Sequence, residues 1–76
     1  MEAFGISFGE RLGLVREDNN LTKSAIARMM GVSPSTWASY ENETSFPSPQ
    51  TIMKFCKTFN VNEEWLFSSE GKVYRS

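Results

Sequence analysis

The sequence contains no histidine and only one cysteine, Cys56, in 76 residues. It therefore lacks the side chain that most often transfers protons near neutral pH, and it can form neither an internal disulfide nor a zinc site of the usual kind. A glycine-rich phosphate loop and a nucleophile elbow are also missing. Glu63 and Glu64 are adjacent on a predicted helix and point in different directions, so they cannot flank one substrate. We expect a protein that is not an enzyme and that uses no metal, cofactor or small-molecule substrate.

Long apolar runs are absent as well. No stretch approaches the length of a membrane span, and the N-terminus lacks the charged and apolar regions of a signal peptide. Cys56 lies among apolar residues at helical spacing, which favours a buried and unreactive thiol. We therefore expect a protein of the reducing cytoplasm with no membrane partner.

Positive charge is not in surplus, because the formal net charge is −1. Proteins that bind nucleic acid usually carry a basic excess, so the total argues mildly against such a partner. The distribution is more informative than the total. Between Leu21 and Tyr40 there is no Asp or Glu, whereas Lys23 and Arg28 are present. One surface of a weakly acidic protein is thus expected to be locally positive.

The apolar content of 39% is enough for the core of one small domain. Ser7 and Glu10 form a capping-box pattern that begins a helix near Phe8. Gly9 and Gly13 each weaken this helix by about 1 kcal/mol relative to alanine, so tertiary packing must hold it.

Residues 21–41 are typical of two short helices joined by a tight turn. Thr22 is a suitable N-cap for the first helix, and Gly31 stands where the chain must leave it in a left-handed conformation. Ser33 caps the second helix, and Pro34 occupies its first turn. The apolar residues at helical spacing are Ile26, Ala27 and Met30 in the first helix, and Trp37 and Tyr40 in the second.

Two more helices are predicted downstream. Ser48 and Pro49 begin one of them, Asn60 ends it, and Asn62 caps a short last helix. Only residues 72–74 carry any strand pattern. The sequence therefore predicts an all-α, compact bundle of about five short helices. We divide it into a flexible N-terminal arm (1–6), a helical domain (7–67) and a C-terminal tail (68–76).

Spacing alone leaves two interpretations of residues 21–41, a helix-turn-helix or an ordinary αα-corner inside a bundle. The residues themselves resemble the lambda-repressor-like family of DNA-binding domains, which includes Cro and the phage repressors. The resemblance covers residues 8–66. Its matching features are Leu21-Thr22, Ile26-Ala27, Met30-Gly31-Val32-Ser33, Ser35-Thr36-Trp37, Tyr40-Glu41-Asn42, Pro47-Ser48, Thr51-Ile52, Phe59-Asn60-Val61 and Glu64-Trp65-Leu66.

The resemblance implies specific roles. In this family the second helix of the motif, here about 34–41, enters the major groove. Arg16 and Glu41 match an internal ion pair that sets the angle of that helix. The implied base contacts are Pro34, Ser35 and Ser39, and the implied phosphate contacts are Thr22, Lys23, Thr36 and Asn42. The alternative for the serines is that they are ordinary solvated helix residues.

This sequence departs from the family pattern at several of these positions. The family often has glutamine, asparagine or arginine where Pro34, Ser35 and Ser39 stand, and serine discriminates poorly between bases. Modest direct readout is expected, with DNA shape or water supplying part of the specificity. Lys23 replaces a common glutamine. Glu43 stands where glycine is usual, which places a negative charge close to the DNA.

Aromatic residues offer a further contrast. Trp37, Tyr40 and Trp65 are expected in the core rather than as base-stacking residues. Phe46 and Phe67 lie outside the helical faces and are expected to be exposed. We place a dimer interface at residues 67–74, because symmetric dimers are the usual way for such small modules to read two half-sites.

We therefore predict a sequence-specific, helix-turn-helix transcriptional regulator of the phage or prophage repressor type, which binds a palindromic operator in double-stranded DNA as a homodimer. The alternative is a protein-interaction or antitoxin-like module on the same fold with weak or no DNA binding. The acidic net charge and the plain serine surface favour that alternative.

Overall fold

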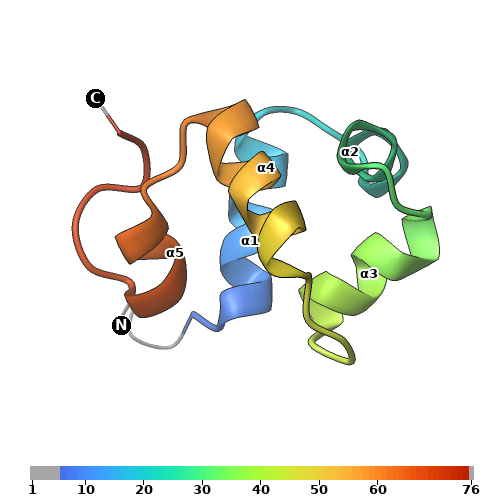
Figure 1. Cartoon of the computed structure of the whole chain (residues 1–76), viewed down its shortest axis with the longest axis horizontal. Coiled ribbons are helices and arrows are strands. Elements are labelled where there is room, and N and C mark those ends of the chain that lie inside the picture. The colour runs from blue at the N-terminus through green and yellow to red at the C-terminus, as the bar shows by residue number, and fades with distance from the viewer. Residues whose placement is uncertain (1–5, 76) are drawn as a thin grey trace.

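The computed structural model describes residues 6–75, which form five helices (Figure 1). They are α1 (Phe8–Asp18), α2 (Lys23–Met30), α3 (Pro34–Asn42), α4 (Pro49–Phe59) and α5 (Glu63–Ser68). Within this range the extended pairing is one isolated antiparallel bridge, between Val61 and Tyr74. The all-α prediction is therefore confirmed. No helix among these residues has the length and apolar character needed to cross a membrane. Residues 1–5 of the predicted arm lie outside the described residues, as does Ser76 of the tail.

The helices begin where the short-range capping patterns place them. In each case a hydroxyl or amide side chain just before the helix accepts a backbone N–H of the first turn, which satisfies one otherwise unpaired donor. Two of these helices, α3 and α4, also carry proline in the first turn. The five capping residues are Ser7, Thr22, Ser33, Ser48 and Asn62.

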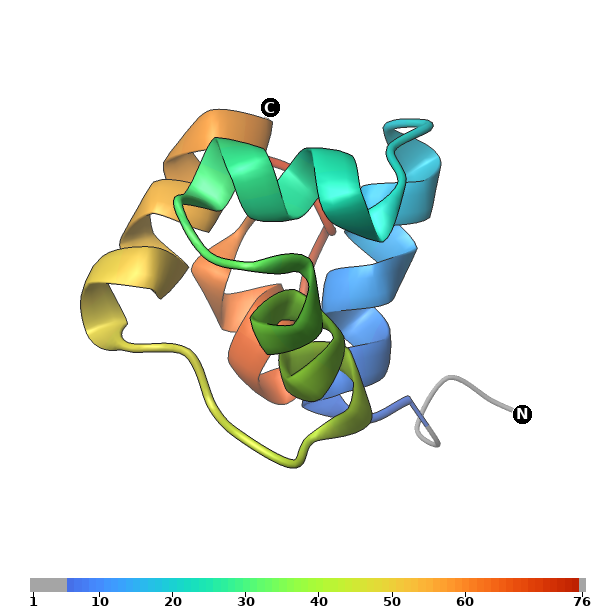
Figure 2. The ribbon, with the colours of Figure 1, turned by 90° about the vertical axis from the view of Figure 1, so that its right-hand side faces the viewer.

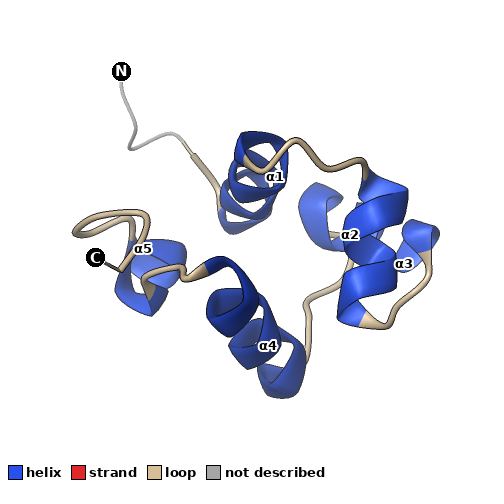
Figure 3. Cartoon of the chain, turned by 90° about the horizontal axis from the view of Figure 1, so that it is seen from above, coloured by secondary structure: helices blue, strands red, loops and turns tan. Residues whose placement is uncertain are grey.

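The helix pair α2 and α3 forms one side of the molecule, and α5 with the C-terminal segment forms the opposite side (Figures 1 and 3). Between the two sides lie α1 and α4. Viewed from the side of the pair, α2 runs horizontally above α3, and the turn descends from one end of α2 to the start of α3 (Figure 2).

The core fills the space between the helices and contains the residues expected there. Trp37 and Phe55 are its largest fully buried side chains, and their rings lie 5.8 Å apart. Tyr40 and Trp65 are also buried, so the prediction that these aromatics belong to the core is confirmed. The remaining buried apolar residues are Leu12, Val15, Ile26, Ala27, Met30, Ile52, Cys56, Val61 and Leu66.

The two glycines of α1 mark a close approach to the end of α3. A Cβ on Gly9 would collide with the backbone carbonyl of Glu41, and a Cβ on Gly13 would lie 3.0 Å from the Glu41 carboxylate. Both positions are weak for helix formation, and Gly9 is also necessary for packing, because its neighbour is backbone. Without Gly9, α1 could not lie directly against the C-terminal end of α3.

Residues 69–75 fold back onto the domain. Asn62 donates its backbone N–H to Val73 at 2.7 Å, and the Tyr74 hydroxyl donates to Asp18 at 2.6 Å. Arg75 donates its backbone N–H to Asn60 at 2.9 Å. The segment predicted as a tail is thus attached both to the end of α4 and to the end of α1.

A buried arginine connects α1 to α5. The Arg11 guanidinium donates to the carbonyls of Leu66 (2.7 Å) and Ile6 (2.7 Å), and to the hydroxyl of Ser69 (2.6 Å). These acceptors lie at the C-terminal end of α5 and just before α1, so a cation there also complements the negative end of the α5 dipole. Arg11 was not predicted from the sequence to have this role.

Candidate nucleic-acid interface

The turn between α2 and α3 has the geometry that a helix-turn-helix requires. Gly31 adopts a left-handed conformation with φ of 76°, as the sequence predicted. The backbone N–H of Val32 then donates to Ala27 at 3.0 Å, which closes the last turn of α2. Val32 is half-buried against the core. The turn therefore fixes where α3 starts relative to α2.

The inner side of α3 is held by one tryptophan and one ion pair. Trp37 is fully buried, and its indole N–H donates to the Glu41 carboxylate at 2.6 Å. The same carboxylate accepts from Arg16 Nε at 2.7 Å and from Arg16 Nη2 at 3.3 Å. A third Arg16 donor, Nη1, reaches the Leu21 carbonyl at 2.8 Å.

The predicted pairing of Arg16 with Glu41 is therefore present in the structure. Hydrogen bonding to the carboxylate raises the pKa of Arg16 above its ordinary value. Because Arg16 also reaches the segment before α2, a single cluster links α1, α3 and the entry to α2. We expect the orientation of α3 to depend on this cluster.

The outer side of α3 carries the small polar residues proposed to contact bases. Pro34 and Ser35 are exposed at the start of α3, and Ser39 is half-buried one turn further along. No other part of the described chain donates to or accepts from the Ser35 or Ser39 hydroxyls, whose contacts all lie within residues 33–39. The side chains that the sequence assigned to base contact therefore remain open to a partner.

The four predicted phosphate contacts lie at the ends of the two helices. Thr22 and Lys23 are exposed at the beginning of α2, and the Thr22 hydroxyl accepts the Ala25 N–H at 3.0 Å. Thr36 is half-buried in the first turn of α3. Asn42 is exposed and is the last residue of α3, one position beyond the predicted helix end. Backbone donors and the dipole at the start of α2 favour an anion there.

The Glu43 carboxylate, which was expected to lie close to the DNA, contacts the start of α1 instead. Glu43 adopts the left-handed conformation (φ 65°) that the usual glycine would supply, and it closes the C-terminal end of α3. Its carboxylate accepts the backbone N–H of Gly9 at 2.7 Å, at the start of α1. Hydrogen bonds from Ser7 and Gly9 lower the pKa of Glu43. The negative charge is therefore directed at α1, where the helix dipole favours it.

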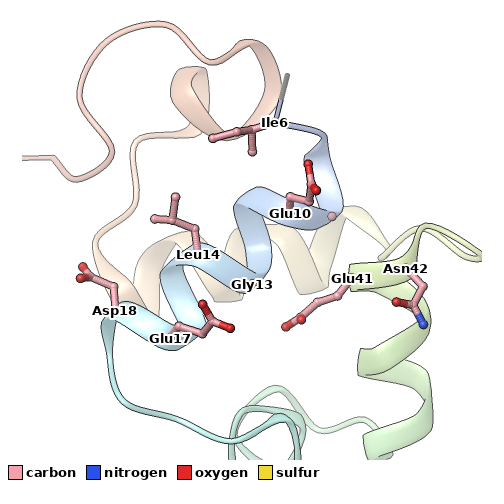
Figure 4. A pocket seen from close by; sticks show the side chains of 9 residues that line it. Ile6, Glu10, Gly13, Leu14, Glu17, Asp18, Glu41 and Asn42 are labelled. Atoms are coloured by element: carbon pink, nitrogen blue, oxygen red, sulfur yellow. The ribbon is translucent and has the colours of Figure 1, made fainter. Parts of the chain in front are cut away.

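A groove of about 840 Å³ runs along α1 beside the end of α3 (Figure 4). Glu10, Glu17 and Asp18 line it together with Glu41. Carboxylates repel phosphate, so this groove is unsuited to a nucleic-acid backbone. By contrast, the acid-free segment from Leu21 to Tyr40 forms α2 and most of α3. The candidate interface is therefore the outer side of α2 and α3.

Comparison with known proteins gives a match over most of the chain. A family model described as a helix-turn-helix domain matches residues 9–72. The HTH-type transcriptional repressor RghR of Bacillus subtilis (strain 168) is 34% identical over 68 residues, which is 88% of this chain and 50% of that protein. The antitoxin PezA of Streptococcus pneumoniae serotype 4 is 35% identical over 54 residues, which is 71% of this chain and 34% of that protein. The chain thus spans half the length of the first relative and about a third of the second.

A solved structure has the same fold. The crystal structure of the P22 c2 repressor, in complex with a synthetic operator, matches with a TM-score of 0.75. The match covers 83% of this chain and 96% of the repressor chain at 21% sequence identity. It confirms the lambda-repressor-like architecture that the sequence predicted.

Proposed function

Because the chain belongs to the helix-turn-helix domain family, we propose that it is a transcriptional regulator that binds double-stranded DNA through α3. The observation that carries the proposal is the geometry of α3. Its inner side is fixed by Trp37 and by the pair of Arg16 with Glu41, while its outer side is open. A helix that is rigidly attached and exposed on one side suits insertion into a major groove.

In the proposed complex the first turn of α3 faces base edges. Pro34 offers an apolar contact to a thymine methyl, and the hydroxyls of Ser35 and Ser39 offer hydrogen bonds. Lys23, with Thr22 beside it at the start of α2, neutralises a phosphate, and the phosphate contacts of Thr36 and Asn42 fix the register. Binding to chromosomal DNA would place the chain in the cytoplasm.

We further propose repression as the regulatory outcome, exerted by a dimer on a palindromic operator of the phage-repressor type. The similarity to RghR, a transcriptional repressor, supports repression. A dimer places two copies of α3 on successive major grooves, about 34 Å apart. A site with two equal half-sites would then match the two-fold symmetry of the protein.

An aromatic surface on the described chain suits a second copy. Phe46 and Phe67 are 62% and 52% exposed, and both pack on Phe8, with ring centroids 4.6 and 5.8 Å from it. Met53, which is 64% exposed, lines a groove with both of them. Val73 and Tyr74 instead pack on the core of their own chain. We therefore keep Phe67 from the predicted range 67–74 and move the rest of the proposed interface to Phe46 and Met53.

A charge change at each of two apolar positions tests this interface. Phe67→Lys is expected to lower the dimer fraction measured by sedimentation, and to weaken binding to a two-half-site duplex more than to a single half-site. Leu14→Lys is the matched control, because Leu14 is also an exposed apolar residue but lies on α1 beside the acidic groove. An unchanged dimer fraction in Phe67→Lys would place the interface elsewhere.

The second candidate function is a protein-interaction or antitoxin-like module with weak or no DNA binding. It is favoured by the similarity to the antitoxin PezA and by the formal net charge of −1. Like-sign charge opposes association with DNA, and a module of this kind would use its helices to bind another protein.

A salt titration of binding to duplex DNA separates the two candidates. DNA binding predicts that affinity falls as salt rises, and that Lys23→Glu weakens binding and lowers the slope of log K against log salt by about 0.9. Lys72→Glu makes the same charge change on the C-terminal segment, away from α3, and is expected to leave the slope unchanged. Absence of binding by the wild-type protein at low salt would overturn the DNA proposal and leave the interaction module.

A further inference from the structure

We propose that, at two positions of the DNA, α3 distinguishes bases that carry an amino group from bases that carry a keto group. The reason is that the Ser35 and Ser39 hydroxyls face the DNA major groove as hydrogen-bond acceptors. The proposal rests on DNA binding through α3 and adds what that helix can distinguish. A serine hydroxyl has one proton and two lone pairs, so it can normally serve either as donor or as acceptor. The hydrogen bonds at the start of α3 restrict this choice, because each of the two hydroxyl protons has an acceptor within residues 33–39.

The first assignment follows from the hydroxyl of Ser33. It accepts the backbone N–H of Thr36 at 3.1 Å and donates its own proton to Thr36 Oγ1 at 2.9 Å. A second oxygen, Ser35 Oγ, lies 3.2 Å from Ser33 Oγ. Either hydroxyl could donate across this contact, but all three Ser33 contacts form together only when Ser35 is the donor, and we infer that arrangement. The lone pairs of Ser35 Oγ remain available.

The second assignment concerns Ser39. Its hydroxyl donates to the backbone carbonyl of Ser35, four residues earlier, at 3.1 Å. The Ser39 proton is therefore also used within the helix, and its lone pairs remain. Ser35 and Ser39 lie one turn apart and both present acceptors.

The Thr36 hydroxyl differs from the two serine hydroxyls, because its proton and not its lone pairs remains available. Its Oγ1 accepts from Ser33, while its own proton has no acceptor among the described residues. A phosphate oxygen is an acceptor and never a donor, so a free hydroxyl proton suits it. The same bonding pattern thus leaves acceptors at the two proposed base-contact serines and a donor at the proposed phosphate-contact threonine.

For the DNA, the consequence is that each contacted position is sorted into two classes of base. In the major groove adenine N6 and cytosine N4 are donors, whereas guanine O6 and thymine O4 are acceptors. A hydroxyl that acts as an acceptor can hydrogen-bond to the amino group of adenine or cytosine. It is repelled by the keto oxygen of guanine or thymine. Each serine therefore separates A or C from G or T on the contacted strand, without separating A from C. Reversing a hydroxyl to serve as donor would break one of the bonds inside the helix.

Selection of bound sites from a random duplex pool tests the inference. We expect two positions per half-site to be enriched in A or C together on one strand. Replacing adenine there by purine, which lacks the amino group, should weaken binding roughly threefold to tenfold, as expected for one hydrogen bond. Enriched sites without this amino-against-keto division would overturn the inference while leaving DNA binding intact. Recovery of no enriched site would count against the proposed function itself.

A pair of alanine variants assigns the effect to a residue. Ser39→Ala should abolish the preference at one position and leave the other. Ser68→Ala is the matched control, because the Ser68 hydroxyl makes the same bond to a carbonyl four residues earlier, to Glu64 at 2.7 Å on α5. Thermal unfolding of both variants confirms that they fold. An unchanged preference in folded Ser39→Ala would refute the role of Ser39.

Discussion

Replacing Glu41 by glutamine tests whether one carboxylate fixes α3. Glu41 and Arg16 have side-chain exposures of 10% and 12%, and the carboxylate also accepts the Trp37 indole N–H. Glutamine keeps the shape but removes the charge, and it turns an amide NH₂ toward donors. Breaking a buried pair by removing one partner costs about 3–5 kcal/mol. Since Arg16 keeps partial access to water, we expect the lower end, about 3 kcal/mol.

The effect should be visible in a denaturant titration followed by tryptophan fluorescence. A domain of 76 residues has a typical unfolding free energy of about 4–11 kcal/mol. A loss of about 3 kcal/mol leaves the variant folded and lowers the melting temperature by about 12–24 °C. The expected result is a lower urea midpoint at an unchanged slope.

Glu17 supplies a matched control within the same cluster. It also contacts Arg16, at 3.5 Å, but its side chain is 74% exposed. An exposed ion pair of this kind contributes about 0–1 kcal/mol, so Glu17→Gln should change the unfolding free energy little. Equal losses in Glu17→Gln and Glu41→Gln would refute the assignment of α3 orientation to the buried pair. A double variant, Arg16→Met with Glu41→Leu, should recover much of the loss, because it leaves no unpaired buried charge.

Three more predictions follow from the packing. Gly9→Ala should lower the unfolding free energy measured in urea by about 3 kcal/mol, because the new methyl meets a backbone carbonyl that cannot move. Gly13→Ala meets a side chain and should lower it far less. Equal losses in the two variants would contradict a close approach of α1 to the Glu41 backbone. Burial raises the pKa of the Cys56 thiol to about 11, so at neutral pH it should react with a disulfide reagent at least about 100-fold more slowly in the folded protein than in urea. Burial and the Asp18 hydrogen bond raise the pKa of Tyr74 to about 12 from 10.0. The contact should therefore stabilise the fold below pH 10.0, and this stabilisation should be lost as the pH rises through about 12. An ultraviolet absorbance titration, with Tyr74→Phe as the reference, measures the pKa of Tyr74, and Asp18→Asn should lower that pKa.

Features set by neighbouring residues could be predicted from the sequence. Each helix start depends on a side chain within three residues of the N–H that it accepts, as Ser7 and Glu10 illustrate. The left-handed conformations of Gly31 and Asn60 follow from local sterics in the same way. The apolar spacing of α3 likewise identified Trp37 and Tyr40 as core residues.

Features set by distant residues could not be predicted. Arg11 donates to a carbonyl 55 residues away, and nothing in its immediate neighbours indicates that acceptor. Glu43 reaches Gly9 over 34 residues, so its left-handed backbone and redirected carboxylate emerge only when α1 and α3 are packed together. The attachment of Tyr74 to Asp18 spans 56 residues. For the candidate interface, residue types suggested the contacts, whereas the hydrogen bonds of the Ser35 and Ser39 hydroxyls are local but depend on side-chain rotamers that the sequence does not specify.

The return of the C-terminal segment determines where attachments can be made. Arg75 is bonded to Asn60 at the end of α4, on the side of the molecule away from α3 (Figures 1 and 3). A fluorophore, an affinity handle or a biosensor surface joined beyond this residue would therefore leave α3 accessible. Immobilisation through this end is the natural geometry for measuring association with a free duplex.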